Sequence, residues 1–373
     1  MSDARGPAEW FIGLMSGTSQ DAVDGVLVEF FAGQTPRLIA SQSVPLSPLL
    51  RGELDALQGA GGGNLDNALR LHHEIGCRFA DCALGVLAAA EVPTNAVRAI
   101  GSHGQTVRHA PNGPSPHSLQ IGNAALIAAR TGIATVADFR SSDIAAGGQG
   151  APLAPAFHKA VFGGRPGRAV LNLGGMANIS FLDAGRGRPW GWDIGPGNVL
   201  LDAWAQRHLK QPCDTEGRFA ASGFVDTELL SALLAHPYIN APPPKSTGRE
   251  DFNLRWLDQL LATLPPLAPA TVQATLAEFT AACVALALSD EPAVSELLVC
   301  GGGVRNADLM RRIGSRLPKI DVASTSRAGV DPQWVEALAF AWLARERVHE
   351  RALDLRRITG ARRPAVLGCV YLP

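Results

Sequence analysis

Residues 11–29 read FIGLMSGTSQDAVDGVLVE, two apolar runs joined by a turn that is rich in Gly, Ser, Thr and Asp. Glycine permits the positive φ angles and the close backbone approach of a tight turn, so this stretch predicts a β-hairpin. Residues 168–183, RAVLNLGGMANISFLD, repeat the order of apolar run, glycine turn and apolar run. The two hairpins predict an internal duplication of one architecture.

Helical and strand-like segments alternate after each hairpin. Apolar residues at helical spacing occupy residues 65–90, 198–209 and 271–288. Further strand-like runs that end at glycine or at a turn residue lie near residues 100, 135 and 300. Strands that alternate with helices predict an α/β fold built of layers.

Chain length and composition predict two soluble domains. At 373 residues the chain exceeds the size at which a single core stops growing. Its 46% hydrophobic and 18% charged residues are typical of a globular protein. A loop-like composition at residues 141–155 puts the expected boundary there. The expected domains are an N-terminal lobe of residues 1–140 and a C-terminal lobe of residues 141–373.

The charge balance argues against polyanionic partners. The 33 Lys and Arg residues nearly equal the 34 Asp and Glu residues, for a formal net charge of -1. This charge gives no field that would gather nucleic acid or an anionic membrane surface. Neither nucleic acid nor membrane is therefore expected as a partner.

Cysteine use and the N-terminus predict a cytoplasmic protein. The six cysteines lie far apart without a CxxC pair, and several sit inside apolar runs such as TAACVALAL. This pattern is typical of buried free thiols in a reducing compartment. Residues 1–10, MSDARGPAEW, lack the basic start and apolar core of a signal peptide. The longest apolar runs fall short of the roughly 18 residues that a membrane span requires.

Three glycine-rich turns stand at the ends of predicted strands, at residues 15–19, 173–178 and 300–306. A turn with glycine and short hydroxyl side chains exposes several N–H groups at once, and this concavity suits a phosphate. Taken singly, each stretch is also explained as a tight turn alone. Three such turns in one chain favour phosphate binding.

Common nucleotide and metal motifs do not explain these turns. A P-loop requires GxxxxGK[ST], but the Lys-Ser-Thr at residues 245–247 follows three prolines, with no glycine at the needed place. The nearest match to GxGxxG, GAGGGN from residue 59, follows a helical stretch instead of a strand. His72 and His73 in LHHEIG lack the HExxH spacing, and solvated helix residues are the simpler interpretation.

Carboxylates follow two of the turns. Asp21 and Asp24 lie close enough to the first turn to hold Mg²⁺ through water, and solvated residues that cap the hairpin are the alternative. Asp193, in GWDIGPGNVLLDAW, precedes a helix that is expected to begin near Asn198, whose amide is a suitable N-cap. Asp193 is well placed to act as a base or to position a water, and a capping role is again the alternative.

Eight motifs occur in one order over nearly the whole chain: GLMSGTSQDAVDG, GSHGQT, DFRSSDIAAGGQGAPLAPAFH, NLGGMANIS, WDIGPGN, PPKSTGREDFN, GGGVRN and EALAFAWLA. Together they closely resemble the anhydro-N-acetylmuramic acid kinase family of the actin, hexokinase and Hsp70 ATPase superfamily. The resemblance implies two similar α/β lobes, ribonuclease H-like or actin-like, with ATP in the cleft between them. It also suggests a homodimer, and residues 350–373 are expected to pack back onto the first lobe.

The resemblance implies roles for individual residues. The implied ATP-binding residues near the phosphates are Gly13, Leu14, Met15, Ser16, Gly17, Thr18, Ser19 and Gln20 of the first turn, with Gly174 and Gly175 of the second. Those near the nucleoside are Gly301, Gly302, Gly303 and Asn306. Asp193 matches the catalytic aspartate, and His103, Arg130 and Glu336 match positions near the sugar.

The implied reaction opens and phosphorylates a 1,6-anhydro sugar in peptidoglycan recycling. In similar enzymes the aspartate activates a water that attacks the anomeric carbon, and the freed O6 takes the γ-phosphoryl group of ATP. Phosphoryl transfer asks the protein mainly for positioning and charge neutralisation, with Mg²⁺ as the implied ion. The water, a poor nucleophile, is what requires a base.

The chain departs from the family pattern at three places. Ile194 stands where relatives usually have a hydroxyl residue, and Asn123 stands where an acid is common. Gln20 is a further variation in the first turn. Of these, Ile194 is the one expected to alter the orientation of Asp193, its neighbour in the chain.

Two rival functions follow from the same superfamily. One is a kinase of an ordinary hexosamine, whose own hydroxyl would be the nucleophile with no water consumed. The other is a nucleotide-driven binding protein of the Hsp70 or actin type, without catalysis on a sugar. Against the second, the chain has no separate peptide-binding domain, because its length is used up by two lobes.

Overall fold

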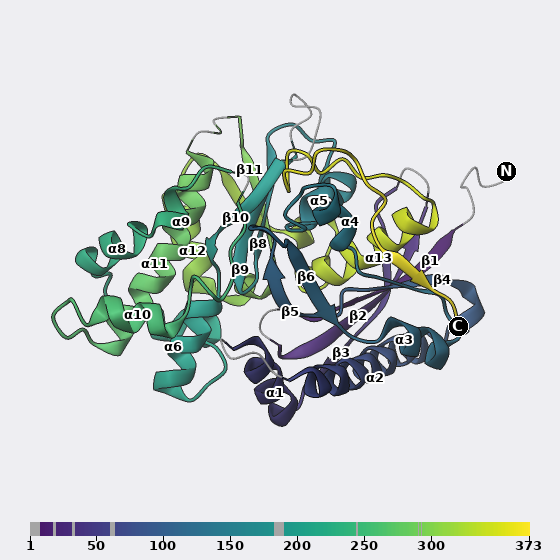
Figure 1. The fold of residues 1–373 in the computed structure, drawn as a ribbon. Helices are drawn as coiled ribbons and strands as arrows, with labels where there is room; N and C mark the ends of the chain where they lie inside the picture. The colour runs from purple at the N-terminus through teal and green to yellow at the C-terminus, as the bar shows by residue number, and fades with distance from the viewer. Residues whose placement is uncertain are drawn as a thin grey trace. The chain divides into compact units, whose positions relative to one another are not determined.

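The computed structural model describes residues 8–17, 20–31, 34–59, 64–182, 190–243, 245–289, 291 and 293–373. It separates into two compact units, which we call unit 1 (Met1–Phe157 with Trp334–Pro373) and unit 2 (His158–Gln333). Each unit contains a mixed β-sheet with helices packed on it (Figure 1). The predicted α/β fold class is confirmed.

Unit 1 is built on a six-stranded sheet of order β13-β7-β4-β1-β2-β3. Its strands are β1 (Glu9–Met15), β2 (Ala22–Phe30), β3 (Arg37–Pro45), β4 (Val97–Ser102), β7 (Thr135–Ala137) and β13 (Cys369–Tyr371). A separate two-stranded sheet joins β5 (Gln105–Ala110) and β6 (His117–Ile121). The helices are α1 (Pro48–Gln58), α2 (Leu65–Ala90), α3 (Ala124–Thr131), α4 (Ser141–Ala145), α5 (Ala154–Phe162), whose last residues lie in unit 2, and α13 (Val335–Val348).

Unit 2 is built on a five-stranded sheet of order β10-β9-β8-β11-β12. Its strands are β8 (Arg168–Leu173), β9 (Met176–Phe181), β10 (Trp190–Pro196), β11 (Glu296–Cys300) and β12 (Asp321–Ser324). Its helices are α6 (Val199–Leu209), α7 (Arg218–Ala221), α8 (Thr227–Leu234), α9 (Pro237–Asn240), α10 (Leu254–Leu261), α11 (Pro269–Leu288) and α12 (Ala307–Arg316).

The two sheets share one topology. In unit 1, β1, β2 and β3 pair antiparallel in sequence order, and β4 and then β7 continue the sheet in parallel on the other side of β1. In unit 2, β8, β9 and β10 pair antiparallel, and β11 and then β12 continue in parallel beyond β8. The predicted duplication is therefore present, and each predicted hairpin is the first strand pair of its sheet.

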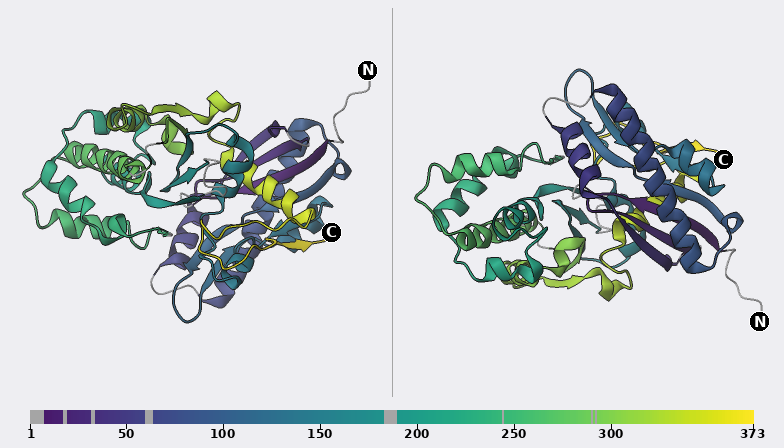
Figure 2. Two further views of the ribbon diagram at one scale, coloured as in Figure 1. Left: turned by 90° about the horizontal axis from the view of Figure 1, so that it is seen from above. Right: turned by 90° about the horizontal axis from the view of Figure 1, so that it is seen from below.

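Strand β1 separates two packing layers in unit 1. Ile12 and Leu14 point into a buried cluster that α2 covers, and α2 lies along this face of the sheet (Figure 2). Gly13 points to the opposite face, as the alternation of a strand requires. There α13 packs so closely that a Cβ on Gly13 would lie 1.9 Å from the Ala337 carbonyl oxygen. Gly13 is thus needed for contact between the strand and the helix.

Replacing Gly13 by Ala should lower the free energy of unfolding by about 1–3 kcal/mol, because the backbone of α13 must move away from β1. The matched control is Gly52→Ala in α1, where nothing lies within 4 Å of the new methyl group. That control should raise the free energy of unfolding by about 0.5–1 kcal/mol, since alanine favours a helix more than glycine does. Urea unfolding of both variants checks this, and equal stability of the two would contradict it.

Helix α11 forms the centre of the unit 2 core. It is 20 residues long with a mean hydropathy of 1.5 over its best 18-residue window, which is enough by length and composition to cross a membrane. The expectation that no such run exists is therefore wrong. However, 72% of that window is buried inside the structure. A helix that is apolar all round is expected where other elements cover every side.

The boundary between the units differs from the expected one at residues 140 and 141. Residues 141–157 and the long helix α13 belong to unit 1. The physical reason is that α13 packs on β1 and β4, and the Phe157 ring packs at a tilt against Trp342 of that helix, with ring centroids 6.1 Å apart. At the C-terminus, β13 pairs with β7, so residues 369–371 also lie on the unit 1 sheet.

Candidate active site

The first glycine turn leaves β1 in unit 1. Gly13 and Leu14 are buried inside the strand, so the turn itself begins near Met15. The Ser16 hydroxyl donates to Gln105 Oε1 at 2.7 Å. Gln105 Nε2 in turn donates to the Gly17 carbonyl oxygen at 3.3 Å. Sequence reasoning missed this anchoring role of Gln105, although it lies in the quoted motif GSHGQT. Thr18 and Ser19 lie outside the described residues.

Gln20 closes this turn. Its φ of 57° is left-handed, and its N–H donates to the Gly17 carbonyl at 3.2 Å. The side chain is 1% exposed and donates from Nε2 to Gln58 Oε1 at 3.0 Å. Gln20 therefore anchors the turn to α1 through its side chain.

His103 joins the first turn to Arg140. Its Nδ1 lies 3.2 Å from the Ser16 carbonyl oxygen, and its Nε2 lies 3.0 Å from Arg140 Nη2. Burial and the Arg140 charge lower the pKa of His103 to about 3, so the ring is neutral at physiological pH. Because a carbonyl accepts and a guanidinium donates, the ring proton must sit on Nδ1. Both ring nitrogens are engaged within the protein.

Helix α13 brings Glu336 to the same side of unit 1 as His103. The His103 ring packs on Phe340 with centroids 4.7 Å apart. Glu336 lies four residues before Phe340 in α13, and residues so spaced share one helix face. The glutamate is half-buried in the first turn of the helix.

Arg130 lies elsewhere in unit 1. Its Nη2 pairs with Asp81 Oδ1 at 2.8 Å, and its Nη1 donates to the Cys77 carbonyl at 3.2 Å. Arg130 sits at the end of α3, just before β7 begins, whereas His103 follows the end of β4. Since β4 and β7 are parallel neighbours, these positions lie at opposite ends of the strands. The structure does not bring Arg130 together with His103.

The two acids of the first hairpin do not form a closed metal cage. Asp21 is exposed and pairs with Arg51 at 3.4 Å. Asp24 is half-buried in β2, opposite Met15 in the strand register. Across the part of the chain that the structure describes, no group of three His, Cys, Asp or Glu side chains could hold a metal. These residues therefore fit Mg²⁺ only as a minor part of its coordination shell.

Asp193 lies in β10, one of the two edge strands of the unit 2 sheet. It is 7% exposed and pairs across the strands with Asn178 of β9. The N–H of Thr247 donates to its Oδ2 at 3.2 Å. The capping alternative does not hold, because α6 begins six residues later, at Val199. The side-chain oxygen of Asn178 is buried and has no hydrogen-bond partner within the described residues.

Asn198 has a different role from the predicted N-cap. It stands at the cap position of α6, but its side chain makes no cap hydrogen bond. Its Nδ2 instead donates to the Leu173 carbonyl at 2.8 Å and to the Gly174 carbonyl at 3.1 Å. Asn198 thereby ties the segment after β10 to the second glycine turn.

The second glycine turn, Gly174 and Gly175, joins β8 to β9. The N–H of Asn198 donates to the Gly174 carbonyl, and the N–H of Gly197 to the Gly175 carbonyl, both at 2.9 Å. A Cβ on Gly197 would lie 2.3 Å from the Gly174 carbonyl oxygen, so the two backbones pack directly. The turn thus lies against the segment that follows Asp193.

The third glycine turn follows β11 in unit 2. Gly301 has a φ of 83°, and a Cβ on Gly303 would lie 2.6 Å from the Leu173 Cβ. Gly302 is open by comparison, with only Asn198 Nδ2 near the limit of 4 Å. Asn306 caps α12 by accepting from the Leu309 N–H at 2.9 Å. The second and third turns therefore meet at the same end of the sheet.

Two of the sequence departures have local explanations. The register of β10 shifts between Asp193 and Gly195, so Ile194 occupies a bulge, and its side chain is 3% exposed in the core of unit 2. An apolar side chain fits that position. Asn123 caps α3 by accepting from the Leu126 N–H at 3.0 Å, which a carboxylate would also do.

Comparisons with known proteins agree over nearly the full chain. A family model described as anhydro-N-acetylmuramic acid kinase matches residues 9–373. The protein of that name from Xanthomonas campestris pv. campestris strain 8004 is 50% identical over 366 residues, with 97% of each chain covered. The one from Bordetella petrii is 50% identical over 369 residues, covering 98% of this chain and 97% of the other. A solved activator of 2-hydroxyisocaproyl-CoA dehydratase from Clostridium difficile, with bound ADPNP, is 13% identical, covers 91% of this chain and 96% of that chain, and has a TM-score of 0.45.

Proposed function

Since this chain belongs to the anhydro-N-acetylmuramic acid kinase family, we propose that it is an ATP-dependent phosphotransferase acting on 1,6-anhydro-N-acetylmuramic acid. Water adds to the anomeric carbon, the bond from that carbon to O6 breaks, and O6 takes the γ-phosphoryl group. The products are N-acetylmuramic acid 6-phosphate and ADP. The reaction serves peptidoglycan recycling and amino-sugar metabolism.

The structural observation that best supports the proposed function is the environment of Asp193. A general base needs a carboxylate that is held in one direction and lies within hydrogen-bond reach of its water. The Thr247 N–H holds Oδ2, and the buried Asn178 oxygen beside it is an acceptor available to a hydroxyl group or a water. We assign Asp193 as the base that takes the proton from the attacking water.

Backbone donors of the glycine turns are assigned to ATP. In the second turn the carbonyl oxygens of Gly174 and Gly175 accept bonds from residues 197–199, so the N–H groups are the side of the turn that suits a phosphate. In the first turn, Met15, Ser16 and Gly17 are the described part of the proposed phosphate loop, with Thr18 and Ser19 completing it. Gly302, open to a ligand, is assigned with Gly301 and Gly303 to the nucleoside.

Mg²⁺ is proposed to enter with ATP. Waters and phosphate oxygens would supply most of its ligands, as is usual for Mg²⁺ bound with a nucleotide. Asp24 and Asp21 would then contact it through water. When bound, the ion neutralises charge on the transferring phosphoryl group.

The residues that were expected near the sugar receive different roles. Glu336 is assigned to the sugar, while His103, whose ring nitrogens are engaged by Ser16 and Arg140, is assigned to holding the first turn. Contact of Arg130 with the sugar stays a prediction, and the ion pair of Arg130 with Asp81 does not support it. We also propose a cytoplasmic homodimer, and the six cysteines, all of them described, form no disulfide, which is compatible with a reducing compartment.

The experiment that tests the proposed function uses water enriched in heavy oxygen, with ATP, Mg²⁺ and 1,6-anhydro-N-acetylmuramic acid. We expect N-acetylmuramic acid 6-phosphate with one heavy oxygen at the anomeric carbon, formed with one ADP, by mass spectrometry at early times. Early sampling matters because reducing sugars exchange this oxygen slowly. Activity only on a reducing hexosamine would transfer the assignment to an ordinary kinase, and no turnover on either sugar would favour a nucleotide switch.

A further inference from the structure

Three residues of unit 2 that lie near one another in the chain, Tyr238, Lys245 and Thr247, contact Asp193. The Asp193 N–H donates to the Lys245 carbonyl oxygen at 3.3 Å, and the Thr247 N–H donates to Asp193 Oδ2 at 3.2 Å. The Tyr238 hydroxyl donates to the Asp193 carbonyl oxygen at 2.6 Å. Three polar atoms of Asp193 are therefore held by these three residues, which we call the clamp.

The clamp is itself braced. Lys245 Nζ donates to the carbonyls of Tyr238 and Ile239, each at 2.9 Å, and lies 4.8 Å from the centre of the Tyr238 ring. Thr247 Oγ1 donates to Asp251 Oδ2 at 2.6 Å. The Tyr238 ring packs edge-on against Phe252, which is fully buried. These contacts give the donors to Asp193 one defined position.

Strand geometry explains why such a clamp is needed. β10 is an edge strand, paired with β9 alone among the described strands, and its register shifts immediately after Asp193. A bulge disrupts the ladder locally, so the ladder alone leaves the direction of Asp193 weakly determined. Misplacing a reacting group by about 1 Å can cost about 100-fold in rate.

We propose that Tyr238 and Thr247 are positioning residues that set the direction of the Asp193 carboxylate for water activation. This inference rests on the proposed function. Tyr238 suits the role because burial, and then the charges of Asp193 and Asp251, raise the pKa of its hydroxyl, which stays a donor throughout the physiological range. Thr247 acts through its backbone N–H, whose position depends on the bond from its hydroxyl to Asp251.

The test compares steady-state kinetics of matched variants of the full chain. Tyr238→Phe should lower kcat by about 10-fold to 100-fold while KM for ATP and for the sugar stays within about twofold, because only the geometry of the base changes. The control is Tyr371→Phe in the exposed strand β13, the other tyrosine of the chain, which should match wild type. Thr247→Val should behave like Tyr238→Phe, and Thr247→Ser should restore most of kcat.

Several outcomes would overturn the clamp. Unchanged kcat in both Tyr238→Phe and Thr247→Val removes the positioning role, and a raised KM at constant kcat would make these residues substrate contacts. A drop in kcat that follows the loss of folded protein, measured by circular dichroism, would make them structural. A wild type without turnover would instead overturn the proposed function and the clamp with it.

A double variant that combines Asp193→Asn with Tyr238→Phe tests whether Tyr238 acts through Asp193. If Tyr238 acts through Asp193, the second substitution costs less than about twofold in the residual kcat. Losses that multiply would mean that Tyr238 acts independently of the base.

Discussion

Replacing Asp193 by Asn should lower kcat by about 10²–10⁴-fold, the contribution expected of a general base. Asparagine keeps the size of the side chain and an oxygen that can accept from the Thr247 N–H, so the fold around β10 should persist. Without a carboxylate the water keeps its proton, and the anomeric carbon is attacked only slowly. Calorimetric titration should still detect ATP and the anhydro sugar at near wild-type affinity.

The control for Asp193→Asn is Asp331→Asn in the same unit. Asp331 is exposed, and its Oδ1 accepts from the Gln333 N–H at 2.9 Å, which an asparagine oxygen can also do. This variant should keep kcat within about twofold of wild type. Near-normal turnover of Asp193→Asn would remove Asp193 from the role of base, whatever its position in the sheet.

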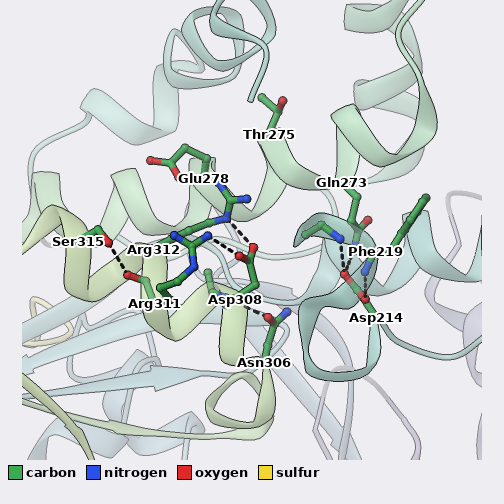
Figure 3. A network of polar contacts seen from close by, with 12 residues as sticks. Asp214, Phe219, Gln273, Thr275, Glu278, Asn306, Asp308, Arg311, Arg312 and Ser315 are labelled. Carbon is green, nitrogen blue, oxygen red and sulfur yellow. Dashed lines mark hydrogen bonds and ion pairs between the residues drawn. The ribbon is translucent and has the colours of Figure 1, made fainter. Parts of the chain in front are cut away.

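Replacing Arg312 by Met should destabilise unit 2 by about 3 kcal/mol, at the lower end of the cost of breaking a buried ion pair. Arg312 bridges α12 to α11: its Nε donates to Asp308 Oδ2 at 2.6 Å, and its Nη1 donates to Glu278 Oε2 at 3.0 Å (Figure 3). The Asp308 side chain is 4% exposed, so losing Arg312 leaves it largely desolvated. The cost stays at the lower end because Arg311 and Arg316 remain as partners.

Arg311→Met is the matched control, because Arg311 pairs with the other oxygen of the same carboxylate. Its side chain is 63% exposed, and exposed ion pairs contribute about 0–1 kcal/mol. Urea unfolding followed by tryptophan fluorescence compares the two variants. Equal losses would mean that burial does not decide the strength of this network.

Local patterns were enough to predict the repeated unit of the fold. The hairpins at residues 11–29 and 168–183 were read from apolar runs and glycine turns, which depend on contacts between neighbours in the chain. The same holds for the strand near residue 300 and for the long helices α2 and α11. Family membership followed from eight ordered motifs, and the same resemblance predicted Asp193 as the candidate base.

Long-range packing decided what the sequence patterns left open. Gly13 reads as part of a phosphate loop, yet its lack of a side chain is required by α13, more than 300 residues later in the chain. The two compact units differ from the expected lobes for the same reason, because α13 and β13 return to the first sheet. Arg130 was expected near the sugar, but the partner that it meets is Asp81 on α2.

The sequence by itself determined the α/β class, the duplicated hairpins, the family and the candidate base, because each is encoded by residues close together in the chain or by the order of motifs. Only the tertiary structure decided which partners hold Asp193. Tyr238 and Thr247 lie 45 and 54 residues beyond it, and no local periodicity relates them to β10. Their role depends on the position of Asp193 beside a bulge in an edge strand. There the partners of Asp193 come from residues that are distant in the sequence.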